Sequence, residues 1–384
     1  MTGQIKTPYY IIHEDKLRRN LELISHVSEQ SGAKIIMAFK ANALWKTFGI
    51  IRDYCQASTA SSLNEMRLSL EFLGNDVHAY CPVYTDTTIG EFVEGRSHIV
   101  FNSVAQYEKY RGFVDGYNSS NAAEKRVSCG LRVNPECSVI ETDIYNPCKP
   151  GSRFGVTRDV LGDVLPEGLE GLHFHCLCES TSYDLEKVLA AFEERFGEFL
   201  PRLKWVNMGG GHLMTREGYD TDHLIDLLRR FRAKYPNLEV ILEPGSAFTW
   251  RTGELIATVL DVVENQGVKT AIIDASFACH MPDCLEMPYK PAITEALAEP
   301  VHGKPTYRIG GNSCLSGDFI GDWSFDKPLA PGDVLTFEDM NHYTTVKTNM
   351  FNGIDHPSMV LLRSDGTVET LREFGYEDYR NRMD

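Results

Sequence analysis

A lysine that directly follows a run of apolar residues is the first feature of this sequence that could do chemistry. The five residues Ile35 to Phe39 are all apolar, which predicts a strand buried on both faces that carries Lys40 at its C-terminal end. Burial of an ammonium is unfavourable unless it is paired or neutralised. Two interpretations therefore compete: Lys40 is a strand-end lysine that reaches solvent, or a Schiff-base lysine with a lowered pKa that condenses with an aldehyde cofactor.

Two turns of small residues end later apolar segments and could bind a phosphate. The triplet Gly209-Gly210-Gly211 lets backbone N–H groups approach an anion, because no Cβ stands in the way. The turn Glu243-Pro244-Gly245-Ser246 ends the next segment and adds one carboxylate. A triple glycine alone is weak evidence, so its weight depends on where the fold places it.

Two histidines, His173 and His175, flank Phe174 in a segment that continues to Cys176 and Cys178. Side chains alternate along a strand, so both histidines face one side and both cysteines the other. Three interpretations stay open: a metal-ligand pair, buried core histidines, or a ring-stacking or hydrogen-bonding contact to a cofactor. The metal interpretation is weakened because the cysteines point away and no further His/Asp pair at ligand spacing follows the other strands.

The elements that must position these residues alternate along the chain as far as Gly245. A short strand at 7–12 and a helix at about 15–30 come first. Eight strand candidates then follow, at 34–40, 58–62, 77–82, 98–102, 127–133, 172–176, 205–210 and 240–245. Eight strand–helix units over roughly 215 residues predict an α/β fold of the (β/α)8 TIM-barrel type. Barrel enzymes carry catalytic groups at the C-terminal ends of strands and bind phosphates after strands 7 and 8, where the two turns fall.

The rest of the chain is expected to be mostly β. Strand-like segments at 255–263, 270–274, 306–309, 333–337, 343–348 and 359–362 are separated by Gly, Pro, Asn and Asp residues. We therefore predict a barrel over residues 11–247, and a β domain formed by residues 1–10 and 248–384 that contributes to the active site and a dimer interface.

The composition limits the classes of partner. The chain has 384 residues, of which 42% are hydrophobic, and a net charge of −16. A negative surface argues against nucleic acid and anionic membranes, since both are bound through Lys and Arg. The sequence has no apolar run of membrane-spanning length and no signal-peptide pattern, so a cytoplasmic protein is expected. Ten cysteines without a framework spacing favour free thiols.

The chain resembles the pyridoxal phosphate (PLP) decarboxylases of alanine-racemase fold, or fold type III, and most closely the carboxynorspermidine decarboxylases. The matching residues include, in order, Lys40, Arg132, His173-Phe174-His175, Gly209-Gly210-Gly211, Glu243-Pro244-Gly245, His280-Met281-Pro282-Asp283, Gly311-Asn312-Ser313-Cys314 and Tyr343. The resemblance covers essentially the whole chain. Its separate motifs are weak, whereas their order and spacing together are specific.

The resemblance implies a role for each matching residue. Lys40 would hold PLP as a Schiff base, Glu243 would face the pyridine nitrogen, and His175 would stack on the ring. A carboxylate at that nitrogen keeps it protonated, so the ring can accept the electrons left when CO2 departs. The other cofactor-binding residues implied are Arg132, Gly209, Gly210, Gly211, Gly245 and Tyr343, with the glycine triplet and Tyr343 on the phosphate.

The resemblance also implies a homodimer. Cys314 from the partner subunit would help to protonate the carbanion after CO2 loss. Taken alone, Cys314 would be a small buried hydrophobe. A racemase on the same fold fits less well, because its base is a tyrosine in the region that Cys314 occupies.

The departures from the family concern the substrate tail. The family carries glutamates where this chain has Ser246 and Ala278. The substrate-binding candidates are Ser246, Asp274, His280, Asp283 and Asp318. The expected reaction converts carboxynorspermidine or carboxyspermidine to norspermidine or spermidine and CO2, in polyamine biosynthesis. The alternative substrate has a neutral or acidic tail, such as citrulline or N-citrylornithine, because a long polycation loses two anionic partners. A zinc hydrolase built on His173 and His175 is the alternative from another class.

Overall fold

The computed structural model describes residues 5–94 and 97–384, which form two compact units. One unit is Arg19–Phe248, and the other combines the chain up to Arg18 with Thr249–Asp384. The sequence-based boundaries were 10/11 and 247/248. The first boundary lies later in the structure because strand β1 (Tyr9–His13) hydrogen-bonds within the C-terminal sheet, so residues 11–18 group with that sheet. Helix α1 (Glu14–Ser31) runs across this boundary.

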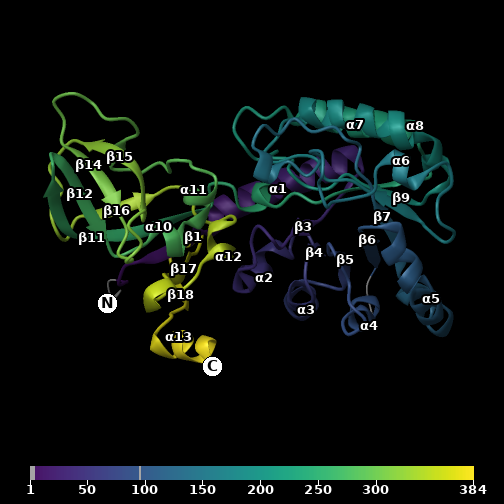
Figure 1. Ribbon diagram of the computed structural model, residues 1–384, viewed down its shortest axis with the longest axis horizontal. Helices are drawn as coiled ribbons and strands as arrows, with labels where there is room; N and C mark the ends of the chain where they lie inside the picture. The colour runs from purple at the N-terminus through teal and green to yellow at the C-terminus, as the bar shows by residue number, and fades with distance from the viewer. Residues whose placement is uncertain (1–4, 95–96) are drawn as a thin grey trace. The chain divides into compact units, whose positions relative to one another are not determined.

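The first unit is a parallel barrel in which strands and helices alternate (Figure 1). Its strands are β2 (Lys34–Ile35), β3 (Met37–Ala38), β4 (Ala57–Ala60), β5 (Asp76–Tyr80), β6 (His98–Phe101), β7 (Ser128–Arg132), β8 (Gly171–His173), β9 (Trp205–Asn207) and β10 (Glu239–Leu242). Its helices are α2 (Phe48–Ile51), α3 (Leu63–Phe72), α4 (Ile89–Val93), α5 (Val104–Ser120), α6 (Arg158–Leu161), α7 (Ser182–Phe196), α8 (Thr221–Lys234) and α9 (Ser246–Thr249). The TIM-barrel prediction is confirmed.

The barrel closes through its first strand, which is divided at Ile36. The β2 half pairs with β10 and the β3 half pairs with β4, and both pairings are parallel. The Ile36 N–H donates to the Leu242 carbonyl, and the Phe39 N–H donates to the Thr59 carbonyl. Residues 34–39 therefore bond to both ends of the sheet, which makes this buried segment the seam of the barrel.

Packing inside the barrel explains two of its glycines. The Trp205 ring is buried, and a Cβ at Gly130 or Gly171 would lie 2.1 or 2.0 Å from that ring. The Trp205 Nε1–H is satisfied because it donates to Ser128 Oγ at 2.8 Å. Since overlap at such distances is prohibitive, only glycine leaves room for the indole in this layer.

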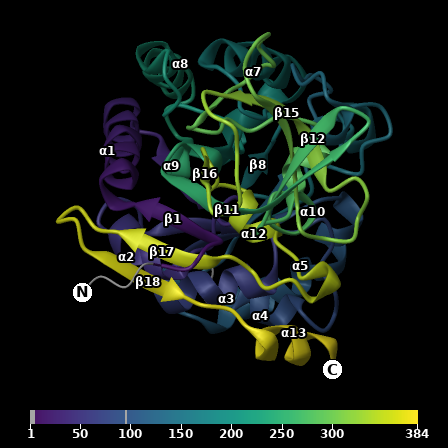
Figure 2. The ribbon, with the colours of Figure 1, turned by 90° about the vertical axis from the view of Figure 1, so that its left-hand side faces the viewer.

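The second unit is a mostly β domain whose sheet contains the N-terminal strand. Its elements are β1, β11 (Gly253–Asn265), β12 (Val268–Ile273), β13 (Ala296–Leu297), β14 (Thr306–Gly310), β15 (Phe319–Phe325), β16 (Val334–Phe337), β17 (Ser358–Leu362) and β18 (Val368–Arg372), with helices α10 (Phe277–His280), α11 (Pro282–Glu286), α12 (Thr344–Lys347) and α13 (Tyr376–Met383). β1 pairs antiparallel with β11 and parallel with β17, beside which it lies in Figure 2. The predicted C-terminal β domain is confirmed.

Three details of the sequence prediction were wrong. The segment 343–348 is not a strand, because Tyr343 has φ 53° and the helix α12 follows it. Strands β13, β15 and β18 were missed. Each of the eight predicted barrel strands ends one to three residues earlier than expected, because the chain leaves the sheet there to form turns.

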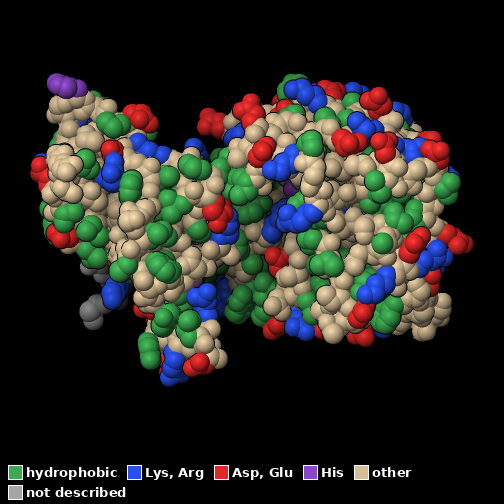
Figure 3. All heavy atoms as spheres, in the orientation of Figure 1, with side chains coloured by type: hydrophobic (Ala, Val, Ile, Leu, Met, Phe, Trp, Pro, Cys, Tyr) green, Lys and Arg blue, Asp and Glu red, His purple; other side chains and the backbone are tan. Residues whose placement is uncertain are grey.

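The described surface mixes both signs of charge. Acidic and basic side chains are interspersed on the face drawn in Figure 3, and many form exposed ion pairs such as Arg67–Glu91 and Arg230–Asp226. Across the part of the chain that the structure describes, we find no helix that combines the length and the apolar character needed to cross a bilayer.

Candidate active site

Lys40 lies just beyond the seam strand. β3 ends at Ala38, and the Ala41 N–H donates back to the Ala38 carbonyl, so Lys40 occupies a turn rather than the strand end itself. Its side chain keeps an opening to solvent, and Nζ lies 3.5 Å from His175 Nε2. Desolvation by the surrounding protein, followed by the charge of Arg132, lowers the pKa of the Lys40 ammonium. A lowered pKa leaves a larger fraction of the amine uncharged and nucleophilic.

His175 is fixed beside Lys40 by the backbone of the glycine triplet. The Gly210 N–H donates to His175 Nδ1 at 2.9 Å. Because a backbone N–H can only donate, Nδ1 must be the acceptor, and the proton of a neutral ring is assigned to Nε2 on the Lys40 side. Burial, followed by the charges of Lys40 and Arg132, lowers the pKa of His175 well below its ordinary value. His175 is therefore a neutral ring of fixed orientation.

Glu243 is a buried carboxylate at the end of β10. Asn207 Nδ2 donates to its Oε1 at 2.6 Å, and His173 Nε2 lies 3.6 Å from its Oε2. Burial raises the pKa of Glu243, while the hydrogen bond from Asn207 and the charge of Lys40 oppose that rise. Sequence reasoning missed Asn207. A polar residue between apolar ones in a buried strand was the available signal, because buried amides need partners.

The glycine triplet is packed too closely for any side chain. Gly209 has φ 69° and Gly211 has φ 90°, which side chains rarely tolerate. A Cβ at Gly209 would lie 2.5 Å from the Phe174 carbonyl, and one at Gly210 would lie 2.4 Å from the Glu243 carbonyl. Gly245 similarly packs against the lysine turn, since its Cβ would meet the Ala41 Cβ at 2.6 Å. The glycines thus bring the ends of β8, β9, β10 and the seam strand close together.

Arg132 is a buried cation held by aromatic rings. Its guanidinium lies over the Tyr80 ring at 4.7 Å and the Phe154 ring at 4.6 Å. One of its N–H groups donates to the His175 carbonyl at 3.3 Å. Arg132 is thereby placed to tie the end of β7 to the segment that carries His175 and to lower the pKa of Lys40.

The candidates in the second unit are arranged around Asp318. This buried carboxylate accepts hydrogen bonds from Ser276 Oγ at 2.8 Å, Ser313 Oγ at 2.6 Å and the Ala278 N–H at 2.9 Å. These bonds join the turn that precedes α10 to the turn that carries Cys314. Asp318 thus has a structural task, and its contact with substrate stays a prediction.

The other substrate-binding candidates also have partners within the second unit. Asp274 accepts from Thr7 Oγ1 at 2.6 Å and from the Thr258 N–H at 2.8 Å, and Asp283 forms an ion pair with Lys347. His280 is buried and accepts the Ser276 N–H at Nδ1. Tyr343 precedes α12, and the Cys314 side chain is exposed while its N–H donates to Asn352 Oδ1. In the first unit, Ser246 begins α9 and is buried.

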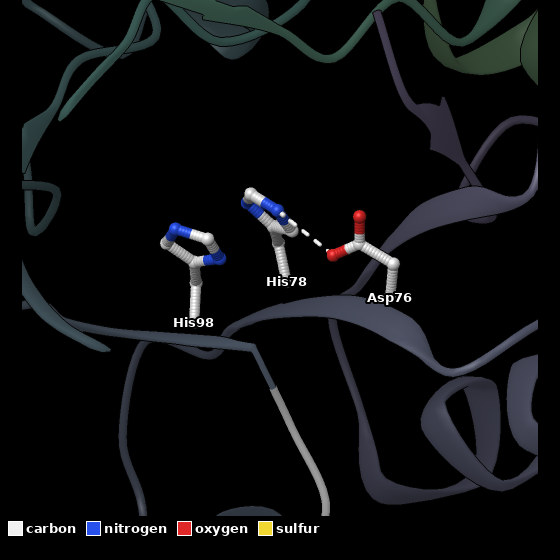
Figure 4. Close-up of side chains that lie close together, drawn as sticks. All are labelled: Asp76, His78 and His98. Carbon is white, nitrogen blue, oxygen red and sulfur yellow. Dashed lines mark ion pairs between the residues drawn. The ribbon is translucent and has the colours of Figure 1, made fainter. Parts of the chain in front are cut away.

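The metal interpretation of the histidine pair finds no support in geometry. β8 ends at His173, so the strand alternation does not continue to Cys178. In residues 5–94 and 97–384, the group of metal-ligating type is Asp76, His78 and His98 (Figure 4). It lies at the N-terminal ends of β5 and β6, at the opposite end of the barrel from Lys40. Lys34 Nζ contacts Asp76 at 2.6 Å and His78 Nε2 at 3.2 Å, so a lysine already supplies the cation there.

This cluster predicts an acid sensitivity of the barrel. Burial, followed by the charges of His78 and Lys34, lowers the pKa of His98 to about 2, against the opposing charge of Asp76. The unfolded chain takes up this proton near pH 6.5, so the stability that neutral His98 contributes is present above pH 6.5 and lost as the pH falls. His98→Phe keeps a ring beside His78, with which His98 stacks at 3.9 Å, and removes this titration. From pH 7 to pH 5 the free energy of unfolding should decrease in both proteins. We expect this decrease to be about 2 kcal/mol smaller in His98→Phe than in the wild type.

Urea denaturation of the two proteins at both pH values measures this difference. An equal loss of stability in the wild type and in His98→Phe would contradict it.

Comparison with known proteins identifies the family of the chain. A family model described as the C-terminal sheet domain of pyridoxal-dependent decarboxylases matches residues 81–341. The chain belongs to the pyridoxal-phosphate-dependent decarboxylases of alanine-racemase fold, and its cofactor is PLP.

Within this family the chain has full-length relatives. It is 45% identical to carboxyaminopropylagmatine decarboxylase of Synechocystis, over 99% of this chain and 96% of that one. It is 40% identical to carboxynorspermidine/carboxyspermidine decarboxylase of Campylobacter jejuni, over 99% of both. A crystal structure of carboxynorspermidine decarboxylase from Campylobacter jejuni, complexed with norspermidine, has a TM-score of 0.89 at 39% identity and covers 98% of this chain and 100% of that one. The predicted family is confirmed. Its activity is decarboxylation, and the racemase and zinc hydrolase alternatives are set aside.

The residues of the first unit fit PLP by their chemistry. An amine with a lowered pKa, a neutral imidazole, a buried carboxylate and a glycine turn lie at the C-terminal ends of neighbouring strands. These are the groups that an aldehyde, an aromatic ring, a pyridine nitrogen and a phosphate require.

Proposed function

We propose that this decarboxylase acts on a carboxylated polyamine, and that Lys40, His175 and Glu243 carry its chemistry. The observation that supports this most directly is the Lys40 amine at 3.5 Å from His175, with a pKa lowered by desolvation and by the charge of Arg132. The named full-length relatives support the substrate class. The alternative neutral or acidic tail is named by none of the relatives given above. We further propose that the enzyme is a cytoplasmic homodimer.

Each residue of the proposed site has a defined task. When bound, PLP supplies an electron sink for the pair released as CO2 leaves. Lys40 would hold the aldehyde carbon through its uncharged amine. Glu243 would keep the pyridine nitrogen protonated, and His175 would hold the ring on one face. Cys314 of the partner subunit would return a proton to the α-carbon.

The named relatives differ in the terminal cationic group of their substrates. Agmatine ends in a guanidinium, whereas norspermidine and spermidine end in an ammonium. The 45% identical relative is named for a substrate with a guanidinium tail, and the 40% identical relative for substrates with an ammonium tail. The two names therefore leave both tails as candidates for this enzyme. Purified enzyme with PLP should be offered carboxyaminopropylagmatine, carboxynorspermidine, carboxyspermidine, citrulline and N-citrylornithine, with CO2 release followed by mass spectrometry. A kcat/KM that is highest for citrulline or N-citrylornithine would contradict the proposed class.

Substitutions of Ser246 test whether this position contacts the charged tail of the substrate. If it replaces an anionic partner of an ammonium, Ser246→Glu should raise kcat/KM for carboxynorspermidine about 10- to 100-fold, because a charge-assisted hydrogen bond contributes roughly 1.5–3 kcal/mol. Ser246→Gln has nearly the same size without the charge and should give no such gain. Equal effects of Glu and Gln would rule out a charge contact at this position.

A further inference from the structure

Asn207, the last residue of β9, closes a ring of hydrogen bonds between the two parts of the proposed cofactor site. Its Nδ2 donates to Glu243 Oε1 at 2.6 Å, and its Oδ1 accepts the Gly209 N–H at 2.9 Å. The Glu243 N–H then donates to the Gly209 carbonyl at 2.7 Å. Asn207 is fully buried.

The orientation of the Asn207 amide follows from its partners. A backbone N–H can only donate, so the amide oxygen must face Gly209 and the amide NH2 must face Glu243. Oε1 of Glu243 therefore accepts a hydrogen bond from the Asn207 amide. The Thr59 side chain is a further hydrogen-bond partner of this carboxylate, whereas His173 Nε2 lies 3.6 Å from Oε2, beyond a good hydrogen bond.

The same amide holds the glycine turn. Gly209 has φ 69°, and a Cβ there would meet the Phe174 carbonyl at 2.5 Å, so this conformation is special and needs support. The Asn207 Oδ1 provides it by satisfying the buried Gly209 N–H. One side chain thus sets both the carboxylate and the turn.

We propose that Asn207 is a positioning residue that fixes the Glu243 carboxylate and the glycine turn together, so that the contacts to the ring nitrogen and to the phosphate of PLP are set in register. This inference rests on the proposed function, in which Glu243 and Gly209–Gly211 bind the cofactor. Leucine cannot make either of the two Asn207 hydrogen bonds, and aspartate can make both only when it is protonated. That difference provides the test.

Asn207→Leu keeps the number and branching of the side-chain heavy atoms and removes both hydrogen bonds. We expect PLP to bind the apoprotein about tenfold more weakly or worse. We also expect the fold-decrease in kcat to exceed the fold-change in the KM for substrate. Asn207→Asp is nearly isosteric, and when protonated it can make both bonds. As the pH rises, the two adjacent carboxyls cannot both stay ionised without repulsion. PLP affinity of Asn207→Asp should therefore fall with rising pH, in a way that the wild type does not show.

The measurements are a PLP titration of apoprotein and the absorbance of bound PLP, each across a pH series, with kcat and KM beside them. Ser58→Ala is the matched control, because it removes a buried hydrogen bond, Ser58 Oγ to Ser69 Oγ at 2.7 Å, in the same barrel. It should leave PLP affinity unchanged. If Asn207→Leu does not fold, the pH series of Asn207→Asp decides alone, and a pH dependence equal to that of the wild type would overturn the inference.

Glu243→Gln separates this inference from the proposed function. If Glu243→Gln alters PLP absorbance and kcat while both Asn207 variants match the wild type, only the positioning role fails. If Glu243→Gln has no effect, the proposed site itself fails.

Discussion

Replacement of Lys40 by alanine should reduce kcat about a thousandfold or more, because no other amine can take over its covalent task at this position. The wild-type protein should also be yellow, and borohydride reduction should fix the cofactor to a peptide that contains Lys40. Lys40→Arg is the matched control, since it keeps the positive charge beside His175 but cannot condense with an aldehyde. It should be as inactive as Lys40→Ala.

Mapping the reduced cofactor decides whether this expectation holds. A label on a different lysine, or an active Lys40→Arg enzyme, would remove Lys40 from the proposed mechanism. If Lys40→Ala is inactive but the wild-type label maps to another lysine, the substitution acts on folding or on substrate binding.

Mixing two inactive variants should restore activity if the proposed dimer shares its active sites. Lys40→Ala retains Cys314, and Cys314→Ala retains Lys40. After random exchange half of the dimers are mixed, and each of those carries one intact site of two, so about a quarter of the sites should work.

A mixture of Lys40→Ala with the double variant Lys40→Ala/Cys314→Ala is the control, because none of its dimers has an intact site. Exchange itself should be followed with chains of different mass. If the chains exchange and activity does not return, Lys40 and Cys314 do not meet across subunits.

The architecture could be predicted from the sequence because its signals are local. Most barrel strands lie in short apolar runs, and eight alternating strand–helix units indicated the fold. The errors lie where tertiary contacts override local pattern. Tyr343 to Thr348 has strand-like composition, yet Tyr343 at φ 53° turns the chain into α12. β15 was missed because its stretch includes Gly321 and Asp322, which weaken the apolar alternation.

The candidate residues of the site could be chosen from the sequence, whereas the contacts between them could not. Lys40, His175, Glu243 and the glycines could be chosen by type and position, since each lies just after a barrel strand. No spacing rule indicated that Arg132 lies between the rings of Tyr80 and Phe154, or that Asn207 joins Glu243 to Gly209. Such contacts join different strands, so they exist only once the barrel has closed.

The position of β1 has a consequence for the order in which the protein can fold on the ribosome. β1 is made first, but its partners β11 and β17 span Gly253–Asn265 and Ser358–Leu362. The whole barrel segment, Arg19–Phe248, leaves the ribosome before either partner is available. The barrel can therefore form during synthesis, whereas β1 meets β11 only after the barrel segment is made and meets β17 only when the chain is nearly complete. The apolar segment Tyr9 to Ile12 thus keeps unpaired strand edges while the barrel is being made, and such edges are prone to aggregation.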